Sequence, residues 1–279
     1  MRLGSDAMKE KMTNEEARQY ISLLFDGYQK RKEENRLYHD DDKVPQIIIN
    51  SYLNLVKKPA FCDLVTIYKN KYIFNESIVE PNISKEERLG LGDVYDYIRQ
   101  FDFNKDYFNI FTTSMLIHNK LYRHCGDGSF GGSLRESTAV LQDLNIEVST
   151  PEEAKIIFNG YITKSINIFN KLNNNDIFGY INDCIRLNVE LIKLQPFADG
   201  NKRTFRALLN LLLKKINIPP IYIEETEALE YKQALIQALK AEKEEDYTRI
   251  IQFYYYKICD AIMTLDINHS KIDTKNFTI

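Results

Sequence analysis

The sequence of 279 residues contains only four cysteines, and they lie far apart along the chain: Cys62, Cys125, Cys184 and Cys259. With no CxxC pair among them, neither a zinc site nor a disulfide framework is predicted. No apolar run approaches the roughly 18 residues that a membrane span needs, and the first twenty residues lack the apolar segment of a secretory signal. We therefore expect a soluble, cytoplasmic protein with no membrane partner.

An excess of positive charge is also absent. The chain has 37 basic and 40 acidic residues, which gives a formal net charge of -3. A protein without a global positive field is poorly suited to a phosphate backbone, so we expect no nucleic-acid partner. The hydrophobic content of 44% is sufficient for a real core.

Helical signals dominate what is present. Thr13, Ser84 and Thr150 each begin a capping box, in which a hydroxyl residue is followed three positions later by glutamate. Apolar residues then recur at steps of three and four, which predicts eight or nine helices and a mainly α fold. Two stretches differ: residues 65–74 alternate around a polar turn like a short hairpin, and residues 134–148 resemble two short strands.

The segment GDGSFG, residues 126–131, matches the dinucleotide fingerprint G-x-G-x-x-G letter for letter. That fingerprint binds a dinucleotide only where it leaves a buried strand and begins a helix. Here it follows a helical pattern and precedes strand-like residues. The glycines are better explained as residues that allow tight turns with positive φ.

The stretch LQPFADGNKRTFRALLN, residues 194–210, joins two predicted helices through a tight polar loop. Gly200 and Asn201 permit a sharp entry into the second helix, and Arg203 and Arg206 lie one turn apart near its start. The amides and the positive dipole of a helix N-terminus attract anions, so this end is a candidate phosphate site. Asp199 would repel phosphate unless Mg²⁺ lay between them, and the loop therefore predicts Mg²⁺ and a polyphosphate.

A simpler interpretation also stands. Asp199 would cap the helix, Gly200 would only turn the chain, and Arg203 and Arg206 would be ordinary surface charges.

These residues resemble the signature of the Fic/Doc (Fido) family, H-P-F-x-[D/E]-G-N-x-R-x-x-R, with one mismatch at Gln195. The segments around it are similar too: residues 116–137 resemble the helix that leads into the family's target-docking flap, and residues 230–254 resemble its closing helix pair. The resemblance implies a Fic-like helical domain over residues 74–265 with a short β-hairpin flap. An N-terminal helical extension at 1–73 and a C-terminal tail at 266–279 would flank it.

Proteins of this family typically move AMP from ATP to a hydroxyl of a target protein, using Mg²⁺. By position, the resemblance implies that Asp199 holds the metal and that Asn201 and the neighbouring backbone amides cradle the α-phosphate. Arg203 would bind the phosphates and Arg206 would take the γ-phosphate, with Gly200 and Lys202 also part of the nucleotide site. The partners implied are ATP and a target protein that docks at the flap, residues 126–148.

Two departures affect the expected activity. The family's histidine takes the proton from the attacking hydroxyl, and Gln195 has no pKa in the useful range. Lys202 stands where members that transfer AMP usually have glycine, and this resembles the Doc branch, which transfers phosphate. The catalytic positions would be Gln195, Asn201 and Arg203, with His118 or His124 as alternative bases. Four functions stay open: slow adenylyl transfer, nucleotide binding without turnover, Doc-like phosphotransfer and a scaffold without nucleotide.

Many family members also carry an inhibitory helix, whose glutamate pairs with the second arginine of the signature. Glu80 in NESIVEPN, residues 75–82, is the candidate in this chain. Glu76 stands where the inhibitory motif has a hydroxyl residue. A plain surface glutamate at position 80 is the alternative.

Overall fold

The protein is described by a computed structural model that covers residues 44–55, 66–80, 83–139, 141, 146 and 148–272, together with the isolated positions 26 and 30. Within these residues the chain folds mainly into helices, as the sequence predicts. The α-helices are α2 (Val44–Leu55), α3 (Thr66–Val79), α4 (Lys85–Gln100), α5 (Ile110–Tyr122), α6 (Pro151–Asn173), α7 (Ile177–Leu194), α8 (Asn201–Lys214), α9 (Ala228–Leu239) and α10 (Thr248–Ile272). Short 3₁₀ turns, η3 (Glu225–Glu227) and η4 (Glu244–Tyr247), flank α9.

The described part of the chain contains nine α-helices, at the upper end of the expected number. None of them combines the length and the apolar character that crossing a bilayer would require.

Two of the three expected capping boxes are present. The Ser84 hydroxyl accepts the Glu87 amide, and the Glu87 carboxylate accepts the Ser84 amide in return. Thr150 and Glu153 make the same pair of bonds at the start of α6, with Pro151 in the first turn. The third box, at Thr13, lies outside the described residues.

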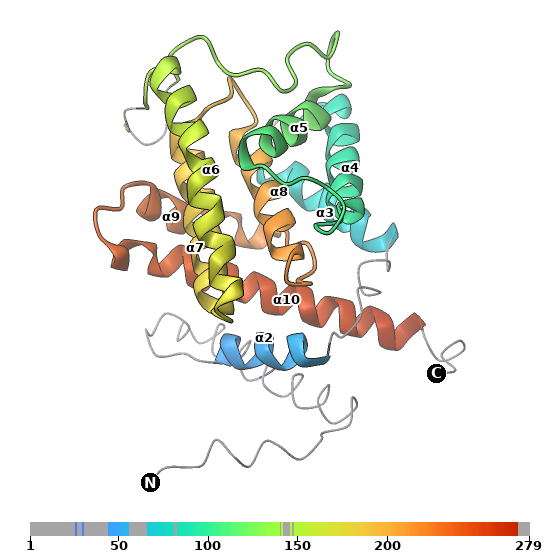
Figure 1. The fold of residues 1–279 in the computed structure, drawn as a ribbon. Helices are drawn as coiled ribbons and strands as arrows, with labels where there is room; N and C mark the ends of the chain where they lie inside the picture. Colours follow the sequence, from blue (N-terminus) through green and yellow to red (C-terminus); the bar gives the residue numbers. More distant parts are fainter. Residues whose placement is uncertain are drawn as a thin grey trace.

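Helix α8 is the centre of the fold (Figure 1). It packs against α7, α5 and α4, and α10 runs crosswise below these helices with α2 on its outer side. Every residue of α8 from Arg203 to Leu213 is buried. Helices α4 and α5 approach each other closely, because a Cβ at Gly90 would overlap the backbone of Leu121. The N-terminus of α8 is thus fixed from several sides.

The hairpin expected at residues 65–74 is wrong. Residues 66–74 belong to α3, and residue 65 lies outside the described part of the chain. The buried face of this helix includes Tyr72, Asn75 and Glu76, at helical spacing. Only Tyr72 of these three lies within residues 65–74, and the two that follow are polar, so the apolar pattern does not indicate the helix.

The flap is not confirmed as a hairpin. Residues 134–139 have no regular structure, and Leu141 and Ile146 form an isolated antiparallel bridge. Residues 140, 142–145 and 147 lie outside the described part. The division of the chain at residues 73 and 265 stays a prediction.

Candidate functional site

The loop between α7 and α8 begins and ends in left-handed backbone. Gln195 ends α7 with φ 49° and ψ 56°, and Gly200 precedes α8 with φ 69°. Position 200 also admits no side chain, because a Cβ there would lie 2.6 Å from the Tyr122 ring and hydroxyl. The sharp entry into α8 that the sequence predicts is therefore present, and it requires glycine.

Among the residues that the structure describes, no side chain caps the N-terminus of α8. The residue before each of α4, α5, α6 and α7 accepts a hydrogen bond from a first-turn amide of its helix, but Gly200 has no side chain to do so. Asp199 does not replace it, because its carboxylate meets Tyr122 and Arg203 instead. The simpler interpretation, with Asp199 as a cap, does not hold. This helix end keeps the positive character that attracts anions.

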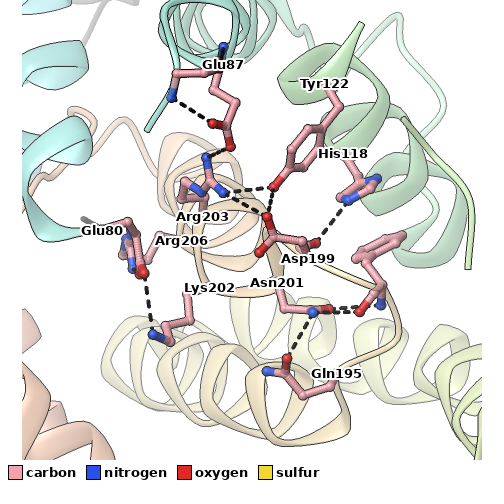
Figure 2. A network of polar contacts seen from close by, with 12 residues as sticks. Glu80, Glu87, His118, Tyr122, Gln195, Asp199, Asn201, Lys202, Arg203 and Arg206 are labelled. Atoms are coloured by element: carbon pink, nitrogen blue, oxygen red, sulfur yellow. Dashed lines mark hydrogen bonds and ion pairs between the residues drawn. The ribbon is translucent and has the colours of Figure 1, made fainter. Parts of the chain in front are cut away.

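Asn201 holds the loop together (Figure 2). Its side-chain oxygen accepts the Phe197 amide at 2.9 Å, and its side-chain nitrogen donates to the Phe197 carbonyl at 2.8 Å and to Gln195 Oε1 at 2.9 Å. Gln195 Nε2 in turn donates to the Ile192 carbonyl at 2.5 Å. Both the oxygen and the nitrogen of the Gln195 side-chain amide are thus hydrogen-bonded within this segment.

Arg203 lies in a polar network at the start of α8 (Figure 2). Its Nη1 donates to Glu87 Oε1 at 2.6 Å, and its Nη2 donates to the Tyr122 hydroxyl at 2.8 Å. Asp199 Oδ2 lies 3.6 Å from the same Nη2. Burial alone would raise the pKa of Glu87, but the Ser84 amide and Arg203 hold it below its ordinary value. The carboxylate that caps α4 therefore also fixes Arg203.

Arg206 is buried against α3. Its Nε lies 3.0 and 3.2 Å from the two oxygens of Glu76, and its Nη2 lies 2.8 Å from Glu76 Oε2. Its Nη1 donates to Glu80 Oε1 at 3.2 Å, and Glu80 Oε2 lies 3.4 Å from Lys202 Nζ. Burial would lower the pKa of Arg206, but Glu76, and to a smaller extent Tyr231 and Glu80, raise it well above its ordinary value. Arg206 is therefore a buried cation with two carboxylate partners.

The side chains of Arg203 and Arg206 do not converge on one binding site. Arg203 turns toward α4 and α5, whereas Arg206 turns toward α3. Neither is an ordinary surface charge, because the side chains are 7% and 3% exposed. The two guanidinium groups therefore point in different directions, and each is paired with carboxylates inside the protein.

A cavity of about 220 Å³, part of it open solvent, lies beside Arg206. It is lined by Glu76, Arg206, Leu209, Asn210, Ile221, Tyr222, Ile223, Tyr254 and Lys257. The side chain of Lys257 is 1% exposed and pairs with Glu227 at 2.7 Å. Each cation at this cavity has a carboxylate partner, so the cavity has no excess positive charge that would favour phosphate.

Asp199 presents the exposed carboxylate of the loop, with 67% of its side chain accessible. Its Oδ2 accepts the Tyr122 hydroxyl at 2.9 Å. Within the described residues, no group of three or more His, Cys, Asp or Glu side chains could hold a metal ion by itself. A single carboxylate nevertheless suits Mg²⁺, which keeps several waters and uses phosphate oxygens as further ligands. Asp199 fits a metal that arrives with a nucleotide.

The two histidines considered as alternative bases lie in different settings. His118 is buried, and burial lowers its pKa to about 4. Its Nδ1 accepts the Gly132 amide at 2.8 Å, and its Nε2 lies 3.1 Å from the Asp199 carbonyl. His124 lies near the surface with Nε2 2.6 Å from Asp93 Oδ2. With both ring nitrogens engaged, His118 is placed as a structural residue rather than as a base.

Sequence reasoning missed several partners of the site. Arg135, 4% exposed, donates from Nε to the Gln195 carbonyl at 2.6 Å and also to the carbonyls of Ser137 and Ser149. It fastens the start of the flap to the loop. The position of Tyr122 could have been inferred from the sequence. It follows His118 by four positions on a predicted helix, so the two side chains share one face of that helix.

Comparison with known proteins agrees with the signature. Residues 111–213 match the family model described as Fic/DOC family. The "Protein adenylyltransferase Fic" of Aedes aegypti is 26% identical over 180 residues, which are 64% of this chain and 32% of that protein. The match thus spans about a third of the length of that relative.

Solved structures support the same fold. Fic-1 of C. elegans, residues 134–508, has a TM-score of 0.56 and 15% identity, with coverage of 90% of this chain and 88% of that chain. A Fic domain containing signaling protein from Bacteroides thetaiotaomicron has a TM-score of 0.52 and 13% identity, with coverage of 94% and 100%. At such identities the likeness establishes the fold alone.

Proposed function

We propose that this chain, whose residues 111–213 match the Fic/DOC family model, binds magnesium ATP at the start of α8 and transfers AMP slowly to a hydroxyl of a target protein, with pyrophosphate as the leaving group. The observation that carries the proposal is the uncapped N-terminus of α8, which follows left-handed Gly200 and has Asp199 and Arg203 beside it. A helix end of this kind binds phosphate through its amides. The named relative, an adenylyltransferase, supports ATP as the nucleotide.

In this proposal Asp199 would hold Mg²⁺, which would neutralise phosphate charge and orient the nucleotide. The amides of Gly200 and Asn201 would receive the α-phosphate, and Arg203 would bind the phosphates beside them. Lys202 adds a positive charge at the same helix end, although it pairs with Glu80 at 3.4 Å. The target would dock at the flap, residues 126–148.

The rate is expected to be low because none of the candidate bases among the described residues is placed to accept the proton. Gln195 carries no useful pKa, and its amide oxygen already accepts from Asn201. Loss of a general base typically lowers a rate by about 10²- to 10⁴-fold. His118 cannot replace it, since both of its ring nitrogens are engaged and its pKa is about 4.

Glu80 is the proposed inhibitory residue, since it holds Nη1 of Arg206. Burial by itself would raise the pKa of Glu80, but Arg206 and Lys202 lower it below its ordinary value. The Glu80 carboxylate is therefore charged at neutral pH, and it would compete with a phosphate for Arg206 and Lys202. An ATP γ-phosphate that reached Arg206 would have to displace it.

Calorimetry with ATP and Mg²⁺ tests the binding step. Arg203→Ala should abolish binding, because it removes the arginine beside the α8 amides. Arg186→Ala is a matched control, since Arg186 pairs with Asp183 at 3.6 Å and with Glu244, away from the site. Wild-type protein that binds no nucleotide would refute the proposal.

ATP labelled at the α- or the γ-phosphate tests the transfer step. Transfer of the α-label to a protein supports adenylyl transfer, and transfer of the γ-label alone would favour Doc-like phosphotransfer, to which Lys202 points. Gln195→His, compared with wild type, should raise the rate if only the base is missing.

A nucleotide-binding protein without turnover is the second candidate. The hydrogen bonds of Gln195 favour it, because they give this side chain a structural task in the loop. Binding of the magnesium nucleotide without transfer of either label, in wild type and in Gln195→His, would support this candidate.

A further inference from the structure

Helix α5 holds Asp199 at two points. His118 and Tyr122 are four residues apart on α5, so their side chains lie on the same face. His118 Nε2 lies 3.1 Å from the Asp199 carbonyl, and the Tyr122 hydroxyl lies 2.9 Å from Asp199 Oδ2. Figure 2 shows both side chains directed from α5 toward Asp199. One residue of the loop is thus held by its backbone and by its carboxylate.

The hydrogen bonds of His118 fix its tautomer. The Gly132 amide donates to Nδ1 at 2.8 Å, so the proton of the neutral ring is on Nε2, which donates to the Asp199 carbonyl. The ring also stacks on Phe197, with centroids 4.1 Å apart and an interplanar angle of 6°. The Gly132 amide therefore determines that the ring nitrogen facing Asp199 carries the proton.

Tyr122 directs the carboxylate itself. Its hydroxyl accepts from Arg203 Nη2 at 2.8 Å and donates to Asp199 Oδ2 at 2.9 Å. Its ring contacts Phe130 edge-on, with centroids 4.8 Å apart, and it lies against Gly200. Because the ring is held in this way, the hydrogen bond from the Tyr122 hydroxyl fixes one oxygen of the Asp199 carboxylate. The rest of this exposed carboxylate is left for a ligand.

We propose that His118 and Tyr122 are positioning residues that orient Asp199 toward a divalent cation bound with nucleotide phosphate, and that the loop around Phe130 and Gly132 sets His118 for this task. The proposal rests on the function proposed above. Groups that hydrogen-bond a metal-ligating carboxylate orient it, and their loss typically lowers metal affinity by about 10- to 100-fold.

The test compares ATP affinity with Mg²⁺ and with EDTA, by calorimetry. The dissociation constant in EDTA divided by the dissociation constant with Mg²⁺ measures the contribution of the metal to ATP affinity. Tyr122→Phe removes only the hydroxyl and should lower this ratio by about 10-fold or more. Tyr180→Phe is the matched control, because it also removes a buried tyrosine hydroxyl, in this case one that donates to the Leu212 carbonyl at 2.7 Å, far along α8 from Asp199. Its ratio should equal that of wild type.

A second readout needs no ligand. Amide hydrogen exchange over residues 197–200 should be faster in Tyr122→Phe and in His118→Phe than in wild type and Tyr180→Phe. His118→Phe keeps a ring that can stack on Phe197 and removes both hydrogen bonds. If folding of one variant fails, the other still tests the proposal.

The outcomes separate the two proposals. A wild-type protein that binds no ATP would overturn both. A wild type whose affinity depends on Mg²⁺, with the same ratio in Tyr122→Phe, would overturn the positioning role alone. An equal loss of ATP affinity with Mg²⁺ and with EDTA would also overturn it, because Tyr122 would then act through Arg203.

Discussion

The buried ion pair between Glu76 and Arg206 allows a sharp test of which carboxylate holds the second arginine. Both oxygens of Glu76 contact the guanidinium group, at 2.8 to 3.2 Å, and the two side chains are only 1% and 3% exposed. Glu80 contacts a single nitrogen at 3.2 Å, and its side chain is 19% exposed. Glu76→Gln would leave Arg206 charged and buried with only one carboxylate.

The expected magnitudes differ clearly. Breaking a buried pair by removing one partner costs about 3–5 kcal/mol, because the other charge stays buried without compensation. An exposed pair contributes about 1 kcal/mol or less, and the loss at Glu80 should lie nearer to this value than the loss at Glu76, because Glu80 is partly exposed and contacts one nitrogen only. Since 1 kcal/mol shifts the Tm of a protein near this size by about 2–4 °C, Glu76→Gln should lower it by about 6–20 °C. Glu80→Gln should lower it by about 4 °C or less.

Thermal unfolding followed by far-ultraviolet circular dichroism measures both variants under the same conditions. The double variant Glu76→Gln, Arg206→Met should recover part of the loss, because it removes the charge that Glu76→Gln leaves uncompensated. Equal shifts for Glu76→Gln and Glu80→Gln, or no recovery in the double variant, would refute the reasoning.

The remaining predictions concern the loop and its supports. Gly200→Ala should destabilise the protein by at least about 1–2 kcal/mol in urea unfolding, because a left-handed residue acquires a Cβ that meets Tyr122 at 2.6 Å; no change would contradict this. For His118 the pKa in the folded state, about 4, is below the ordinary value, so its contribution is complete above about pH 6.5 and is lost as the pH falls toward 4. The loss approaches about 3 kcal/mol, and His118→Phe should flatten this part of the stability–pH curve. Arg135→Lys should speed amide exchange in residues 134–139, because one ammonium group cannot reproduce the guanidinium bonds to three carbonyls, Gln195 among them; unchanged exchange would argue against this role.

The loop and α8 could be predicted from the sequence because their signals are local. Gly200, Asn201 and the two arginines lie within seven positions, and a helix N-terminus imposes its geometry on those positions alone. The capping boxes at Ser84 and Thr150 were predicted for the same reason. Short-range hydrogen bonds depend on residues three or four apart, which a single sequence shows directly.

The direction of the arginines could not be predicted, because their partners are distant in sequence. Arg203 meets Glu87 across 116 positions, and Arg206 meets Glu76 across 130. The spacing of residues along α8 does not indicate which helices pack against it. Helix α3 is not predicted from the sequence because its buried face continues beyond residue 74 through Asn75 and Glu76, and polar residues on a buried face hide the apolar pattern by which a packed helix is recognised.

Access to Arg206 depends on which of its two partners can leave. Glu76 binds two nitrogens of the guanidinium group from inside the protein, and moving it would require α3 to separate from α8. Glu80 binds one nitrogen, follows the last residue of α3 and shares its charge with Lys202. An incoming phosphate could replace Glu80 at both cations without disturbing Glu76. Under the proposed function, we therefore expect that a nucleotide would contact Arg206 at Nη1 alone, on the side where Glu80 now lies, and that Arg203 and the α8 amides would contribute most of the affinity.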